Sequence, residues 1–364
     1  MVKIRMSEPY LGEEELKNAT QAISEGWISS NGRFIEEFEK EFSSYIGTKN
    51  GITMSNGTTA IHAALLVLGI KRGDKVIVPS LTSIACTNAI AYIGAEPVFA
   101  DSTQEYWCMD PEKIEGLIDS KTKAIMPVHI YGHPCDMDRI TEIAKKHDLR
   151  IIEDCAEAHG ALYRNKKVGN FSDIACFSFY GNKIITTGEG GMCLTNNQEL
   201  ADSMRVIRNQ ATKPEYKNKY YYDMVGYNYR MTNIQAAIGV AQLKKIDYLI
   251  RKRRELAKLY NDLLGGSSGI VTPPEMPWAM NIYWYYSILV ERGNRDKVTK
   301  ALEAAGIESR PFFYPIHMLP MYKKGGVSLP VSEDLGFRGI NLPSGPQLSE
   351  EQIKEVAAII LKAV

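Results

Sequence analysis

Two residues of this chain have the types and surroundings for chemistry on a carbonyl group. Lys183 lies between an apolar run and a glycine-rich turn, where a simple surface charge explains it poorly. Asp154 ends an earlier apolar run, where a carboxylate is costly unless it is paired. A partly buried lysine can form a Schiff base with an aldehyde, and a carboxylate can keep a pyridinium nitrogen protonated. Together the two residues predict a site for pyridoxal phosphate (PLP).

A third group of residues suits the phosphate of such a cofactor. Asn56, Gly57 and Thr58 stand where a predicted helix over residues 60–68 begins. A helix N-terminus attracts phosphate through its free N–H groups and partial positive charge. Ser178 could add a hydroxyl group. An ordinary helix cap would explain the first group equally well, as a structural salt bridge would explain Asp154 alone.

The bulk composition argues against several other classes of protein. The chain has 364 residues, with 43 basic and 43 acidic side chains and a formal net charge of zero, so nucleic-acid binding is not expected. Its six cysteines form no C-x-x-C pair, which favours reduced thiols over disulfides or zinc. The histidines show no metal-ligand spacing, and we expect no metal site. No segment reaches the ~18 apolar residues of a membrane span. We therefore expect a cytoplasmic protein that does not enter a membrane.

Short apolar segments alternate with helical patterns through the first half of the chain. The predicted strands cover residues 75–78, 97–100, 124–127 and 150–153. The predicted helices between them cover residues 83–92, 111–118 and 137–147. This alternation predicts a mainly parallel sheet covered on both faces by helices. Ligand sites of such sheets gather at the carboxyl ends of the strands, where Asp154 falls.

A boundary follows a long helical pattern over residues 232–264. Glycines and then prolines come after it, which indicates a break between domains. Beyond it we predict a strand over residues 284–290 and helices over 296–305 and from Ser349 onward. We expect a large domain over residues 1–245 and a small α+β domain over residues 246–364. Roughly the first 25 residues are expected to pack on the small domain.

Two irregular segments could bind a substrate. One runs from Gly226 to Asn233 and contains Arg230, and the other combines aromatic residues with Arg310 and His317. Loops often carry binding residues because a rigid scaffold positions them. A loop with an ordinary helix cap and a structural histidine would explain the same segments.

Taken in chain order, these elements resemble the sugar aminotransferases of the DegT/DnrJ/EryC1/StrS family. The resemblance extends from residue 27 to residue 344, nearly the whole chain. The five elements described above carry it, and the segments Phe177–Lys183, Tyr131–Met137, Arg310–His317 and Glu333–Pro343 support a closer match to one branch within the family. It implies an α/β fold of the PLP-dependent transferase fold type I, like aspartate aminotransferase, with a mainly parallel central sheet and a smaller α+β C-terminal domain.

The resemblance also implies roles for individual residues. Lys183 would form the bond to PLP, Asp154 would pair with the pyridinium nitrogen, and Glu157 would lie close to the ring. Asn228 matches a residue that reaches the cofactor phosphate of the neighbouring subunit, which implies a homodimer with shared active sites. The full set of expected cofactor-binding residues is Asn56, Gly57, Thr58, Asp154, Glu157, Ser178, Lys183 and Asn228. The candidates for substrate contact are Ser29, Arg230, Tyr314 and His317.

Within the family, the resemblance is strongest to the branch that makes GDP-perosamine. That branch moves an amino group from L-glutamate to C4 of GDP-4-keto-6-deoxymannose, for O-antigen and other surface lipopolysaccharide. The substrate expected here is thus a nucleotide-linked 4-keto-6-deoxy sugar. A UDP- or dTDP-linked sugar remains an alternative, because the shared motifs separate the nucleotides poorly.

Other activities fit the residues less well. A PLP-dependent sugar 3-dehydratase has histidine where this chain has Lys183. A non-catalytic PLP-binding regulator normally carries a DNA-binding domain, and the enzyme fold already accounts for the 364 residues. A Rossmann dehydrogenase would need a G-x-G-x-x-G motif after its first strand, which this chain lacks.

One position departs from the family pattern. Many relatives carry an aromatic ring at the position of Ser83, beside the face of the cofactor. Because serine cannot stack on a ring, we expect another residue to pack there or the packing to be weaker.

Overall fold

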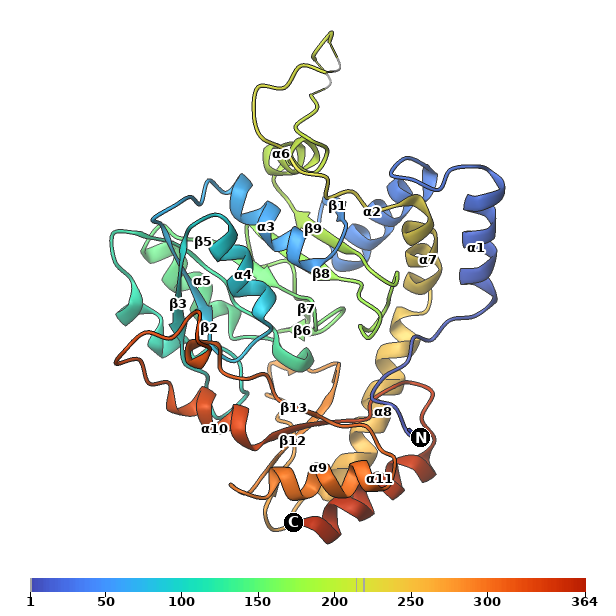
Figure 1. The fold of residues 1–364 in the computed structure, drawn as a ribbon, viewed down its shortest axis with the longest axis vertical. Coiled ribbons are helices and arrows are strands. Elements are labelled where there is room, and N and C mark those ends of the chain that lie inside the picture. The colour runs from blue at the N-terminus through green and yellow to red at the C-terminus, as the bar shows by residue number, and fades with distance from the viewer. Residues whose placement is uncertain (1, 214, 219) are drawn as a thin grey trace.

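The computed structural model describes residues 2–213, 215–218 and 220–364, and its central layer is a seven-stranded sheet (Figure 1). The strand order is β1 (Asn50–Met54), β9 (Gly191–Thr195), β8 (Ile174–Ser178), β5 (Arg150–Asp154), β4 (Thr122–Ile125), β2 (Lys75–Pro79) and β3 (Glu96–Ala100). The pairs from β8 to β3 are parallel, and β9 is antiparallel to both of its neighbours. The predicted mainly parallel sheet is confirmed.

Helices cover both faces of this sheet, as predicted. They are α2 (Arg33–Ile46), α3 (Gly57–Val67), α4 (Ile84–Tyr92), α5 (Met137–Lys146), α6 (Gln198–Arg208) and α7 (Asn233–Leu243). Successive residues of a strand point to opposite faces, and β8 shows the result. Phe177 packs in one hydrophobic cluster with Phe38 and Phe42 of α2, whereas Cys176 packs in another with Ile61 of α3.

A second sheet of four strands lies in the C-terminal part of the chain. Its order is β10 (Ile270–Val271), β12 (Tyr286–Val290), β14 (Gly339–Leu342) and β13 (Arg310–Pro311). Helices α8 (Ile246–Leu264), α9 (Arg295–Ala304) and α11 (Glu350–Ala363) share a hydrophobic cluster with it, and α10 (Pro330–Arg338) precedes β14. A small third sheet joins β11 (Ala279–Met280), β6 (Leu162–Tyr163) and β7 (Lys166–Lys167). The division at residue 245 stays a prediction, with the two larger sheets on either side of it.

The N-terminal segment contacts both parts of the chain. Ile4 forms a bridge with Ile307 near the second sheet, as the predicted packing of the first residues on the small domain requires. Helix α1 (Glu13–Ser24) instead packs against α7, where the Asn18 amide donates to the carbonyl of Ala237 at 3.1 Å. Packing of the first 25 residues on a small domain therefore stays a prediction.

Two predicted helices differ from the structure. The long helix over residues 232–264 is broken between Leu243 and Ile246, where Lys245 turns to bond Glu15 of α1 at 2.7 Å. The helix predicted over residues 111–118 is two short 3₁₀ turns, with Gly116, a poor helix former, in the second. All six cysteines are free and buried. Among the described residues, no helix has the length and apolar character needed to cross a membrane.

A buried histidine makes the stability of this fold depend on pH. His159 is fully buried among Phe42, Phe177 and Phe179, and burial, together with the charge of Lys183, lowers its pKa from 6.5 to about 3. Below pH 6.5 the histidine of the unfolded chain binds a proton, whereas His159 of the folded chain stays neutral. The free energy of unfolding therefore falls as the pH falls through that value.

We predict that His159→Phe removes this pH dependence. Between about pH 7.5 and about pH 5, the wild type should lose on the order of 2 kcal/mol more free energy of unfolding than the variant. Urea unfolding curves at both pH values measure the difference. His147→Ala, at a surface histidine beside Glu115, is the control and should lose as much as the wild type. Parallel losses in the wild type and His159→Phe would contradict the prediction.

Candidate active site

Seven of the predicted cofactor residues line one cavity of about 330 Å³ at the carboxyl ends of the strands. They are Asn56, Gly57, Thr58, Asp154, Glu157, Ser178 and Lys183. Asp154 and Ser178 are the last residues of β5 and β8, and Asn56 and Gly57 come just after β1. The edge of a mainly parallel sheet thus brings together residues that lie far apart in the sequence, as predicted.

One end of the cavity is the first turn of α3. The Asn56 side chain caps the helix by accepting from the Thr59 amide at 2.9 Å, and the earlier amides of the turn have no intrahelical acceptor. A Cβ on Gly57 would lie 2.8 Å from the Cβ of Ser178, so only glycine lets the helix approach β8 this closely. Free amides beside a serine hydroxyl form a cradle that fits a phosphate group.

Asp154 is held rigidly at the end of β5. Its amide donates to the carbonyl of Pro127 at 2.9 Å, and its carbonyl accepts from the His129 amide at 3.2 Å. Its Oδ1 accepts from the Ala156 amide at 2.9 Å, and its Oδ2 accepts from the thiol of Cys86 at 2.8 Å. A buried carboxylate fixed in this way, and lining the cavity, fits the partner of a pyridinium nitrogen.

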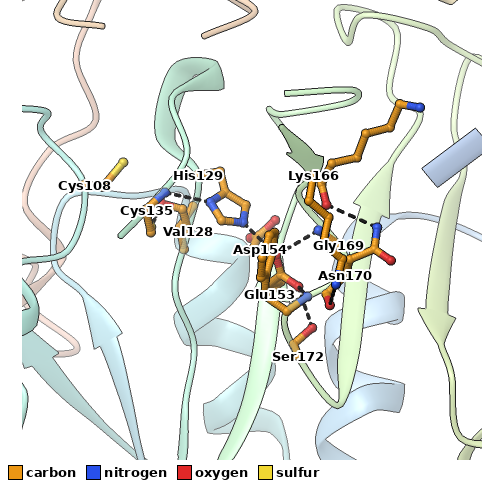
Figure 2. A network of polar contacts seen from close by, with 12 residues as sticks. Cys108, Val128, His129, Cys135, Glu153, Asp154, Lys166, Gly169, Asn170 and Ser172 are labelled. Carbon is orange, nitrogen blue, oxygen red and sulfur yellow. Dashed lines mark hydrogen bonds and ion pairs between the residues drawn. The ribbon is translucent and has the colours of Figure 1, made fainter. Parts of the chain in front are cut away.

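The neighbouring acid, Glu153, belongs to a different network (Figure 2). Its Oε1 accepts from His129 Nε2 at 3.1 Å and from the Gly169 amide at 2.8 Å, and its Oε2 accepts from Phe171 and Ser172. Burial would raise the pKa of Glu153, but the hydrogen bonds from His129 and the loop amides outweigh burial and lower it.

His129, Glu153 and Cys155 lie close enough together to share an ion. However, His129 Nδ1 accepts from the Cys135 amide at 3.0 Å, which leaves Nε2 as the donor to Glu153. Both ring nitrogens are thus used, and the cluster acts as a hydrogen-bonded support beneath Asp154.

Lys183 lies, largely buried, between a carboxylate and an indole ring. Its Nζ is 3.8 Å from Oε1 of Glu157 and 3.7 Å from the centre of the Trp284 ring, and its side chain is only 10% exposed. Burial lowers the pKa of Lys183, while the charges of Glu157 and Asp154 act in the opposite direction. A lowered pKa leaves more of the amine unprotonated, which is the form that attacks an aldehyde.

Glu157 is the acid that faces this lysine. Burial raises the pKa of Glu157 to about 7, although the charge of Lys183 and the Tyr131 amide, which donates to Oε2 at 2.8 Å, favour the ionised form. Burial thus shifts both side chains toward their neutral forms. A phosphate cradle, a buried carboxylate and this lysine open into the same cavity, and together they fit PLP.

Sequence reasoning missed two residues of this site. Trp284, which precedes β12, covers Lys183 and donates from its indole nitrogen to the Asn182 carbonyl at 2.7 Å. Cys86, in α4, donates to Asp154. The only sequence signal for Trp284 is the aromatic run Tyr283–Tyr286, and Cys86 has none. Ser83 lines the cavity and accepts from the Ala85 amide at 3.4 Å as the N-cap of α4.

The remaining predicted residues lie outside this cavity. Asn228 and Ser29 are exposed, and Arg230 bonds Asn209 at 2.8 Å beside a different cavity of about 650 Å³. Tyr314 is half exposed and packs edge-on against Phe337. Their roles stay predictions.

His317 is buried, and both of its ring nitrogens lie close to other protein groups. Its Nδ1 lies 2.7 Å from the Ser80 hydroxyl just after β2, and its Nε2 lies 3.2 Å from Glu333 of α10. The structure therefore shows His317 joining the end of β2 to the C-terminal part of the chain. Its predicted contact with substrate stays a prediction.

Known proteins resemble this chain over nearly its full length. A protein of Escherichia coli O157:H7 named GDP-perosamine synthase is 48% identical over 354 residues, covering 97% of this chain and 96% of that protein. The protein of the same name from Caulobacter vibrioides is 47% identical over 363 residues, covering 98% and 97%.

The fold and the family agree with these relatives. A PLP-form structure from Streptococcus pneumoniae is 27% identical, has a TM-score of 0.92 and covers 99% of both chains. The profile of the DegT/DnrJ/EryC1/StrS aminotransferases matches residues 9–361. The predicted fold type, cofactor and reaction class are therefore confirmed, and this chain belongs to the DegT/DnrJ/EryC1/StrS aminotransferase family of PLP-dependent enzymes.

Proposed function

We propose that this enzyme transfers the amino group of L-glutamate to C4 of GDP-4-keto-6-deoxymannose and so makes GDP-perosamine for surface polysaccharide. The observation that carries amino transfer is the buried Lys183, which opens into one cavity with Asp154 and the α3 N-terminus. The proposed sugar and nucleotide are supported by the relatives that are named for GDP-perosamine synthesis.

Each charged residue of the cavity has a distinct task in this proposal. PLP, when bound, draws electrons from the substrate carbon and lowers the cost of removing its proton. The negative charge of Asp154 keeps a positive charge on the pyridine nitrogen. The N–H groups at the start of α3, with Ser178, hold the phosphate.

Lys183 is the base that moves the proton. Its lowered pKa leaves the amine free to take a proton from the α-carbon of glutamate and, in the second half of the reaction, to deliver one to C4 of the sugar. Trp284 and Glu157 both lie within 4 Å of Nζ, and they limit where the amine can move.

The active enzyme is proposed to be a homodimer with shared sites. The described residues between α6 and α7 are here called the arm (209–213, 215–218 and 220–232); both of its ends pack on the large sheet's domain, and the loop between them extends beyond α6 (Figure 1). The arm exposes Tyr220, Tyr221, Tyr222, Met224 and Val225. Exposed apolar groups of this size favour burial against a partner. Asn228 of the arm is exposed and does not line the cavity of its own chain, which suits a contact with the cofactor phosphate of the second copy.

We predict amino transfer from glutamate to the GDP-linked 4-keto-6-deoxy sugar, and little transfer to UDP- or dTDP-linked sugars tested in parallel. Lys183→Ala should lower the rate by about 10²–10⁴-fold or more, because the proton-moving base is lost. Borohydride should fix PLP to the wild type and not to this variant. Lys166→Ala, at an exposed lysine, is the control. Transfer only to a non-GDP sugar would reject the proposed substrate and keep the reaction class.

Removing the charge of Glu157 should shift the pH profile of cofactor uptake. The charge of Glu157 raises the pKa of Lys183 and so opposes burial, and Glu157→Gln should lower that pKa further. The midpoint pH for PLP uptake by the cofactor-free protein should therefore fall. Absorbance changes after mixing measure the rate at each pH. Glu189→Gln, at an exposed acid of the same cavity, should leave the midpoint in place. An unchanged midpoint in Glu157→Gln would contradict the assignment.

Shared sites can be tested by mixing two inactive variants. Lys183→Ala and Asn228→Asp each spoil one contribution to a site, the second through repulsion of the phosphate. Random assortment should restore about a quarter of wild-type activity, because half of the dimers would be mixed and each would hold one intact site. Mixing Lys183→Ala with Asp154→Ala is the control and should restore none, since both residues come from the same chain. Equal activity in the two mixtures would exclude shared sites.

A further inference from the structure

A thiol contacts the carboxylate that is assigned to the cofactor nitrogen. Cys86 Sγ lies 2.8 Å from Oδ2 of Asp154, and both side chains are buried. The contact is shorter than a sulfur donor usually makes, and it joins α4 to the end of β5. The mechanism described above makes no use of this contact.

The local sequence holds the thiol in place. Ser83 caps α4, and its carbonyl accepts from the Cys86 amide at 3.3 Å, so the first helical turn is fixed on the cavity side. The Thr82 hydroxyl lies 3.6 Å from Sγ and can donate to the sulfur. The thiol proton is then left for Asp154.

The thiol is held in its protonated form. Burial, followed by the charge of Asp154, raises the pKa of Cys86 well above its usual value. A thiol that stays protonated at neutral pH is a hydrogen-bond donor and not a nucleophile. Cys86 therefore stabilises a charge on its partner without adding one of its own.

The contacts of the Asp154 carboxylate leave it able to accept a further hydrogen bond from the cavity side. Oδ1 accepts from the Ala156 amide and Oδ2 accepts from Cys86, so each oxygen has one protein donor and lone-pair capacity to spare. Two donors on different oxygens prevent rotation of the carboxylate about its last bond. The remaining acceptor capacity faces the cavity that Asp154 lines.

We propose that Cys86 is a positioning residue for the reaction: its S–H bond fixes the orientation of the Asp154 carboxylate that holds the cofactor nitrogen. This inference rests on the proposed role of Asp154. A thiol is a weaker donor than a hydroxyl group, so it orients the carboxylate while neutralising little of its charge. The full charge then remains for the positive nitrogen.

Cofactor affinity separates this role from simple core packing. Cys86→Ala should weaken PLP binding about five- to tenfold, less than the loss of an ordinary hydrogen bond to a charged group because a thiol is a weak donor, and Cys86→Ser should stay within about twofold of the wild type. Cys193→Ala is the matched control, because Cys193 is also buried but donates to the Ala60 carbonyl instead of Asp154. Equal dissociation constants for the two alanine variants would overturn the inference.

An infrared measurement on the cofactor-free protein tests the bond itself. The S–H stretching band that disappears in Cys86→Ala should shift to higher frequency in Asp154→Asn, because a neutral amide accepts more weakly than a carboxylate. A band that does not move would show that the thiol does not bond Asp154. Wild-type PLP affinity in Asp154→Asn would reject the role of Asp154, whereas weak binding there with normal binding in Cys86→Ala would reject only the role of Cys86.

Discussion

The site depends on the cost of burying two adjacent carboxylates at the end of β5. Glu153 and Asp154 are both buried, and a buried charge is tolerated only where hydrogen bonds or opposite charges compensate it. Glu153 is fully satisfied by His129 and by the loop at residues 169–172. Among the described residues, the Asp154 carboxylate receives donors from the Ala156 amide and the Cys86 thiol, and it opens into the cavity. The first acid therefore stabilises the scaffold, and the second is left to act on a ligand.

The cost of burying a charge also explains the environment of Lys183. Its amine is largely removed from water, and it lies near a carboxylate with a raised pKa and against an indole face. A fully ionised partner at hydrogen-bond distance would hold the amine as a cation, and an apolar surrounding alone would leave nothing to accept its proton. The arrangement found here lies between these extremes. Lys183 can therefore form a bond to the cofactor, release the cofactor again and carry a proton.

The sequence predicts those elements whose structure depends on residues close together in the chain. The apolar run of β5 ending in acids, the cap at Asn56 and the strand–helix alternation can be recognised in the sequence, and seven of the residues predicted from them line one cavity. Trp284 and Cys86 were not readable, because they reach the site from elements far away in the chain. The break after α7 has no proline or glycine in it, and Lys245 at the break contacts Glu15 of α1, which is more than 200 residues away in the sequence. The burial of His317 likewise follows from packing between distant segments.

Successive side chains of β5 point to opposite faces of the sheet, so the position of a residue along the strand decides which environment its side chain enters. Ile151 and Ile152 lie in different hydrophobic clusters, and Glu153 and Asp154 continue that alternation toward the His129 network and the cavity. Loss or gain of a single residue inside the strand would exchange the two acids between these environments. The longer acid would then project into the cofactor cavity, and the shorter one would fall short of its amide donors. Evolution can thus lengthen the loops around this strand freely, but it can change the strand itself only in steps of two.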